Sequence, residues 1–138
     1  MSKYLHKVHY YETDRMGITH HSNYIRWMEE ARVEFLDSVN WGYDKMEAVG
    51  IMSPVIGIDC EYKKTTTFAD VVSITLQVRE YNGIKLILGY EMRLKNTDEV
   101  VAIGESRHCF LGEGQRPISL KKSYPELDEA IKQQMTER

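Results

Sequence analysis

The sequence predicts an α+β fold in which a curved antiparallel β-sheet wraps around one long central α-helix. Two patterns predict it. Apolar residues recur every three or four positions in residues 22–39, as on one face of a helix, whereas apolar and polar residues alternate through most of residues 56–111. A single long helix with one apolar stripe needs a surface to cover it, and a sheet wrapped around the helix provides that surface.

One strand and two helices are expected in the first part of the chain. Residues 3–11 alternate in the manner of a strand, and the side chains expected on one face are Tyr4, His6, Val8 and Tyr10. The long helix should begin near Ser22 or Asn23, either of which can cap it, and should end at residues 40–42. Its expected apolar stripe consists of Ile25, Met28, Ala31, Phe35 and Val39. A shorter helix is expected at residues 44–49.

Four strands and a C-terminal helix are expected in the rest of the chain. Short turns at residues 81–83 and 96–99 separate the last three strands, which favours an antiparallel meander. The side chains that should share a face on each strand are Ile56, Ile58, Cys60 and Tyr62, then Val72, Ile74, Leu76 and Val78, then Leu86, Leu88, Tyr90, Met92 and Leu94, and finally Val101, Ile103, Cys109 and Leu111. Gly89 and Gly104 interrupt this pattern, and each should mark a bulge or the close approach of a helix. The C-terminal helix is expected at about residues 123–135.

The composition is typical of a single globular domain. The chain has 138 residues, of which 42% are hydrophobic, so we expect residues 1–138 to fold around one core. The net charge of −3 and the lack of a basic run argue against nucleic-acid binding. The sequence shows neither a secretory signal nor an apolar run long enough to span a membrane, so we expect a cytoplasmic protein without a membrane partner.

Residues 11–32 carry the densest chemistry of the chain and read YETDRMGITHHSNYIRWMEEAR. The carboxylate of Asp14 precedes a turn at Gly17, and this turn leads into the helix that begins near Ser22. The first backbone N–H groups of a helix have no partner within the helix and attract negative charge. A carboxylate placed beside such groups suits attack on a carbonyl whose oxygen becomes negative.

This segment resembles the signature of hot-dog-fold acyl-CoA thioesterases, and most closely the 4-hydroxybenzoyl-CoA thioesterase-like branch. The matching pattern is D-x-x-G-x-x-x-H-x-N-Y followed by W-x-E-x-A-R, and the expected element order agrees with that fold over about residues 3–112. Only the C-terminal helix lies outside it. The resemblance implies hydrolysis of an acyl-CoA thioester to a free acid and coenzyme A without a cofactor. It also implies a homodimer or homotetramer, because the coenzyme A tunnel in this fold usually lies between subunits.

The resemblance also implies roles for single residues. Asp14 would attack the thioester carbonyl or activate a water that does so, while the backbone N–H of His21 would hold the oxyanion. The His21 side chain could position substrate or water, or simply help to start the helix. Residues expected to bind substrate or to line the acyl pocket are Gly17, His20, Asn23, Tyr24, Trp27 and Phe68. Candidate contacts for the coenzyme A phosphates are Lys63, Lys64, Arg79, Lys85 and Arg93.

Other interpretations of the acidic residues stay open. Asp14 could serve only as a turn residue that bonds its own backbone. Glu29 and Glu30 are reserve catalytic candidates, because a second branch of hot-dog thioesterases uses a glutamate on the central helix. Glu29 could instead form an ion pair with Arg32, which would be worth little at an exposed site.

No metal site is predicted at His20 and His21. Adjacent histidines rarely converge on one ion, and no third ligand follows at a recognisable spacing. Cys60 and Cys109 also match no metal-binding spacing. Two alternatives to an acyl-CoA thioesterase remain, namely hydrolysis of acyl groups carried by acyl carrier protein and non-catalytic binding of acyl-CoA.

Overall fold

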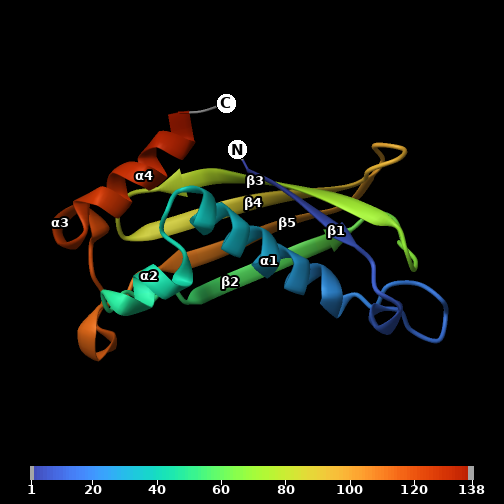
Figure 1. The fold of residues 1–138 in the computed structure, drawn as a ribbon, viewed down its shortest axis with the longest axis horizontal. Coiled ribbons are helices and arrows are strands. Elements are labelled where there is room, and N and C mark those ends of the chain that lie inside the picture. The colour runs from blue at the N-terminus through green and yellow to red at the C-terminus, as the bar shows by residue number, and fades with distance from the viewer. Residues whose placement is uncertain (1, 137–138) are drawn as a thin grey trace.

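The computed structural model describes residues 2–136, and in that part of the chain five strands form one antiparallel sheet (Figure 1). The strands lie in the order β1-β3-β4-β5-β2, so that β1 and β2 form the two edges. Their bounds are Ser2–Lys7 for β1, Val55–Tyr62 for β2, Val71–Tyr81 for β3, Lys85–Leu94 for β4 and Val100–Cys109 for β5. The long helix α1 crosses one face of the curved sheet, as the α+β prediction requires.

Helix α1 (Ser22–Ser38) packs its apolar stripe onto the sheet, and the short helix α2 (Tyr43–Ala48) follows it. Met28, Ala31 and Phe35 are each 1% exposed, as predicted. Ile25 was expected in the same stripe but is 37% exposed. The buried face of α1 also extends over polar residues, which a hydrophobic pattern does not mark.

The first strand is shorter than predicted, since β1 ends at Lys7 and a 3₁₀ turn occupies Tyr10–Glu12. Tyr10 is consequently 76% exposed, whereas the alternation placed it on the buried face. The backbone N–H of His9 donates to the buried carboxylate of Glu12 at 2.8 Å, and this bond turns the chain away from the sheet.

The buried face of β5 is also different from the prediction. Its inward side chains are Ala102, Gly104, Ser106 and His108, whereas Ile103 and Cys109 are only half-buried. The β4–β5 register shifts beside Val101, because Met92 pairs with Ala102 while Arg93 pairs with Val100. An extra residue in one strand moves the following side chains to the opposite face.

Gly104 marks the predicted close approach of helix and sheet. A Cβ atom at Gly104 would lie 2.9 Å from the Sδ and Cε atoms of Met28 on α1, and 3.0 Å from the carbonyl oxygen of Asp59 on β2. Glycine at this position therefore lets α1 sit close to the sheet.

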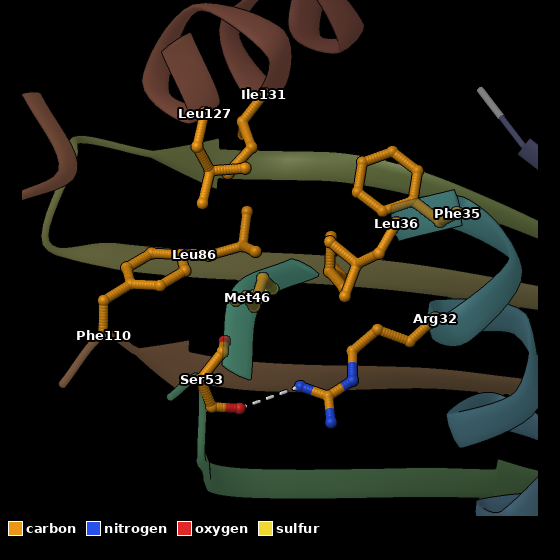
Figure 2. Close-up of a pocket in the computed structure, with 10 residues that line it drawn as sticks. Arg32, Phe35, Leu36, Met46, Ser53, Leu86, Phe110, Leu127 and Ile131 are labelled. Carbon is orange, nitrogen blue, oxygen red and sulfur yellow. Dashed lines mark hydrogen bonds between the residues drawn. The ribbon is translucent and has the colours of Figure 1, made fainter. Parts of the chain in front are cut away.

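The C-terminal helices contribute to the single core expected for residues 1–138. α3 (Leu120–Ser123) and α4 (Pro125–Thr136) cover the end of the sheet near β3, and Leu127 and Ile131 are fully buried. Figure 2 shows these two side chains and Phe35 around a cavity of about 10 Å³, which has room for one water at most. Within residues 2–136, no helix has the length and apolar character needed to cross a membrane.

Candidate active site

The loop between Glu12 and α1 is closed at its base by hydrogen bonds. The carbonyl oxygen of Glu12 accepts the backbone N–H of His20 at 2.8 Å and the side-chain amide of Asn23 at 3.0 Å. Thr13 and Thr19 form an antiparallel bridge one step further along the loop. Both ends of the loop are thereby fixed to the start of α1.

Asp14 occupies the tight turn of this loop and is half-buried. Its carbonyl oxygen accepts the N–H of Gly17 at 3.0 Å, and its Oδ1 accepts the N–H of Met16 at 2.8 Å. Gly17 has φ = +79°, a backbone conformation that favours glycine. Within residues 2–136 the structure shows no hydrogen bond to Oδ2, so one carboxylate oxygen stays available beyond the turn.

His21 precedes the first turn of α1 with φ = −56° and ψ = −28°, so it takes the N-cap position expected for Ser22 or Asn23. The backbone N–H of Asn23 donates to the His20 carbonyl, and the N–H of Ser22 lies 3.3 Å from His20 Nδ1. No acceptor for the N–H of His21 is found in the described part of the chain. This is the donor that the sequence predicts for an oxyanion.

A cleft of about 330 Å³ opens beside the helix entrance. Its lining residues are Ile18, Thr19, His21, Tyr24, Tyr62, Lys63, Lys64 and Thr65. Tyr62 at the end of β2 donates its hydroxyl to the His21 carbonyl at 3.1 Å, and its ring meets the Tyr24 ring edge-on at 5.1 Å. Asp14 is not part of this lining, so the cleft contains the helix entrance but not the carboxylate.

Comparison with known proteins gives a consistent result. A family model described as the thioesterase-like superfamily matches residues 8–135. The chain belongs to this superfamily. It is a thioester hydrolase with the predicted hot-dog fold, and the match extends into α4, beyond the residues 3–112 over which the expected element order resembles that fold.

Individual relatives agree with the family match. The chain is 32% identical over 120 residues to the Bacillus subtilis protein named "Putative acyl-CoA thioesterase YneP", with 87% of each chain covered. It is 31% identical over 99 residues to the long-chain acyl-CoA thioesterase FadM of Escherichia coli, covering 70% of this chain and 72% of FadM. The DHNA-CoA thioesterase structure from Staphylococcus aureus superimposes with a TM-score of 0.90 at 28% identity, covering 96% of this chain and 89% of that one.

Two of the expected substrate-binding residues of this thioesterase lie beneath the site. Asn23 is 6% exposed and bonds the loop backbone, while Trp27 is fully buried and donates its indole N–H to Glu12 Oε2 at 2.8 Å. The hydroxyl of Tyr24 lies 3.0 Å from Thr66 Oγ1, and its ring borders the cleft. Asn23 and Trp27 thus position the loop, whereas Tyr24 can touch a ligand.

The loop at residues 65–70 packs against the Asp14 loop. Thr19 donates its N–H to the carbonyl of Thr66 at 2.8 Å, and Thr67 donates its hydroxyl to the carbonyl of Gly17 at 2.7 Å. Phe68 is 53% exposed and meets the ring of Tyr10, so the structure does not bring it to the cleft.

His20 and the five candidate phosphate contacts also fall into separate groups. His20 is exposed, and its ring stacks on that of His21 at 4.3 Å. Lys63 and Lys64 line the cleft, where they pair with Glu61 and Glu99 at 2.7 and 2.6 Å. The remaining three, Arg79, Lys85 and Arg93, lie on β3 and β4 and do not line it.

Glu12 is a structural residue of the site that the sequence did not single out. It is 5% exposed and accepts bonds from the His9 N–H, the His6 ring and the Trp27 indole. Burial alone would raise the pKa of Glu12, but these hydrogen bonds lower it below its usual value. Its place in the motif, two residues before Asp14, was the only signal of its importance.

The reserve candidate Glu29 is occupied by other contacts. Its Oε1 accepts Arg32 Nη2 at 2.8 Å and the hydroxyl of Tyr43 at 3.1 Å. The predicted Glu29–Arg32 pair is therefore present, with Glu29 exposed as expected but Arg32 only 6% exposed. The other reserve candidate, Glu30, accepts the hydroxyl of Tyr4.

Arg32 continues into a chain of buried polar groups between α1 and the sheet. Its Nη1 lies 2.7 Å from His108 Nδ1, whose Nε2 lies 2.7 Å from Ser106 Oγ, which in turn lies 2.7 Å from the Tyr90 hydroxyl. Burial and the charge of Arg32 lower the pKa of His108 to about 3, and burial raises the pKa of Tyr90 to about 12. His108 and Tyr90 are both neutral at physiological pH, so this series of hydrogen-bonded side chains has a structural role.

Proposed function

We propose that this protein is an acyl-CoA thioesterase in which Asp14 supplies the catalytic carboxylate and the His21 N–H stabilises the oxyanion. The observation that carries the proposal is the unpaired N–H of His21 at the start of α1, at the end of a loop that presents Asp14. The names of the relatives support coenzyme A as the thiol part of the substrate.

Asp14 would act through the oxygen that the turn leaves free. The bond from Met16 N–H fixes Oδ1, so the orientation of the carboxylate is set before substrate binds. Attack on the thioester carbonyl, directly or through water, drives negative charge onto the carbonyl oxygen. The His21 N–H and the positive end of α1 would stabilise that charge. Since a thiolate leaves readily, the reaction needs little further acid catalysis.

The cleft beside His21 is the proposed entry for the coenzyme A arm. Lys63 and Lys64 provide positive charge at its lining, and their carboxylate partners Glu61 and Glu99 are exposed enough to be replaced by phosphate. The cleft lining thus selects two of the five basic residues that were candidates for phosphate contacts. It also favours coenzyme A over a carrier protein as the substrate's thiol part, because the positive charge is local rather than spread over a docking surface.

We further propose that two chains pair through β2. Within residues 2–136, β5 is the only strand that pairs with β2, and the apolar side chains of β2 are exposed, with Ile56 at 56%, Val55 at 42% and Ile58 at 37%. An exposed apolar edge of this kind favours association. Antiparallel pairing of β2 with its copy would bring the start of β2 in one subunit beside the end of β2, near His21, in the other.

This pairing suggests a place for the acyl group. A second cleft of about 480 Å³ lies at the start of β2, with a lining that includes Ile51, Met52, Pro54 and Leu111. In the paired chains it would adjoin the His21 cleft of the other subunit.

The pairing through β2 can be tested with two lysine variants. Ile56→Lys should give a monomer with little activity, whereas Ile84→Lys, at a position 52% exposed but off β2, should stay dimeric and active in sedimentation and thiol-release assays.

The oxyanion assignment can be tested by removing one backbone N–H. Proline fits the φ of −56° at His21 but has no N–H, whereas alanine keeps it. We expect His21→Pro to lower kcat by about 100-fold or more for a panel of acyl-CoAs, and His21→Ala to lower it far less. Equal activities of two folded variants would contradict the assignment. Binding of acyl-CoA without turnover by the wild-type protein would instead favour a non-catalytic role.

A further inference from the structure

A second group of reactive side chains lies where β1 ends, away from the cleft. His6, His9 and Glu12 each place a potential ligand atom within 4.8 Å of the others. His6 and Glu12 are buried and His9 is exposed, and His6 Nε2 lies 2.8 Å from Glu12 Oε1. The group is thus closed on one side and open to solvent on the other.

We propose that His6, His9 and Glu12 form a binding site for a divalent transition-metal ion, with zinc as the best match. Two imidazoles and one carboxylate are donors that zinc prefers, and three protein ligands leave a fourth position for water on the open side at His9. The proposal is independent of the thioesterase reaction, because none of the three side chains lines the cleft beside His21.

The surrounding contacts are those that orient metal ligands. Glu30 Oε1 lies 3.4 Å from His6 Nδ1, the ring nitrogen that faces away from Glu12, and it also accepts the Tyr4 hydroxyl. Trp27 Nε1 holds Glu12 Oε2 at 2.8 Å. A carboxylate behind a ligating histidine and a donor behind a ligating carboxylate fix their orientations in metal sites.

The charge balance also suits a cation. The carboxylates of Glu12 and Glu30 bring negative charge to both nitrogens of the His6 ring, at 2.8 Å from Nε2 and 3.4 Å from Nδ1. A bound ion would replace the proton between His6 Nε2 and Glu12 Oε1, while His6 Nδ1–H would donate to Glu30. Ligand atoms already 2.8 Å apart would need to separate only slightly to admit the ion.

A metal at this position would connect β1 to the Asp14 loop. Besides its carboxylate contacts, Glu12 accepts the N–H of His20 and the amide of Asn23 with its carbonyl oxygen. An ion bound to His6 and Glu12 would therefore stabilise the segment on which that loop closes. Since only the folded chain holds the three ligands together, binding should raise the Tm.

The experiment is a titration of tag-free protein with Zn²⁺, followed by calorimetry and thermal unfolding. We expect one ion per chain and a Tm increase. His9→Ala removes an exposed ligand without opening the core and should weaken the Kd by about 100-fold or more. His20→Ala, at another exposed histidine, is the matched control and should bind like wild type. Absence of saturable binding, equal affinity in His9→Ala, or loss in His20→Ala would each overturn the proposal.

A second measurement reports the ligands directly. Co²⁺ bound to wild type should give the visible absorption of a four-coordinate site. His9→Cys should keep binding and add a thiolate-to-Co²⁺ charge-transfer band in the near ultraviolet. If that band does not appear while Co²⁺ still binds, residue 9 is not a ligand and the proposed site is wrong.

Discussion

Helix α1 carries two polar regions that differ in how completely their groups are paired. At its entrance, one oxygen of Asp14 and the N–H of His21 have no partner in the described part of the chain, and a cleft adjoins His21. In its middle, Glu29 and Arg32 bond each other, and Arg32 also bonds Ser53 and His108. We therefore expect the catalytic carboxylate at the entrance rather than in the middle of the helix.

We expect the difference in pairing to correspond to a difference in function. Groups that act on a substrate must be free to exchange partners, whereas buried groups must keep theirs because desolvation without a partner is costly. In the middle region only the buried Nε of Arg32 lacks a hydrogen-bond partner among the described residues. We therefore expect variants in the middle region to change stability, and variants at the entrance to change turnover.

Arg32→Met should have the largest effect on stability. It leaves His108 Nδ1 and the Ser53 carbonyl without their donor, and removal of one partner from a buried polar network costs about 3 kcal/mol. For a chain of this size that corresponds to a Tm decrease of about 10 °C. Thermal unfolding and thiol release at low temperature would check both parts. If Arg32→Met kept its stability but lost turnover, the middle region would be the functional one, contrary to our expectation.

The pH dependence of stability should report His108. Unfolded His108 takes up a proton below its ordinary pKa of 6.5, whereas folded His108 does so only near 3, so the unfolded state binds more protons in between. The free energy of unfolding should therefore fall as pH decreases through this window, by up to about 1.4 kcal/mol per pH unit. Denaturant unfolding should be measured between pH 4.5 and 6.5, above the ordinary glutamate pKa of 4.5. This interval separates the effect of His108 on the free energy of unfolding from that of Glu12.

His108→Gln is the control for that measurement, because it keeps a polar side chain that does not titrate. We expect its stability to depend less on pH over the same interval. An identical slope in the variant and in wild type would show that other groups carry the dependence.

Gly17→Ala tests the turn that presents Asp14. Alanine at φ = +79° costs about 1–2 kcal/mol although nothing lies within 4 Å of the added Cβ. Gly114→Ala is the matched control, with φ = +71° and equally open surroundings in a turn away from the site. Both variants should lose similar stability, but only Gly17→Ala should lower kcat. Equal kcat values would mean that the turn does not position the carboxylate.

Lys64→Ala should have the smallest effect. An exposed lysine contributes about 1 kcal/mol or less to binding, so we expect KM to rise up to about fivefold with kcat unchanged. Lys85→Ala, at an exposed position outside the cleft, should leave KM as it is. Steady-state kinetics at low ionic strength would show the difference most clearly.

Much of this fold could be predicted from the sequence because its patterns are local. The alternation in β3 and β4 placed Ile74 and Leu88 correctly in the core, and Gly104 marked the helix contact. The inward face of β5 could not be predicted, since a bulge at Val101 moves it by one residue and bulges depend on the neighbouring strand. His108 was missed for this reason.

The site residues, too, could be predicted only where the signal is local in the sequence. The motif predicted Asp14, Gly17 and His21, and the structure places them around one turn and one helix entrance. The sequence could not show that Trp27 would bond Glu12, because the two residues belong to different elements and meet only after folding. Tyr62 was likewise assigned only to a strand face, although it contacts His21 across the cleft.

The most direct test of the account compares Asp14→Asn with Glu29→Gln in a thiol-release assay on the same acyl-CoA, after both are shown to be folded. We expect Asp14→Asn to lose at least about 100-fold in kcat/KM, and Glu29→Gln to keep near wild-type kcat/KM despite a lower Tm. Near wild-type activity in Asp14→Asn together with loss in Glu29→Gln would contradict the account and move the catalytic carboxylate to the middle of α1.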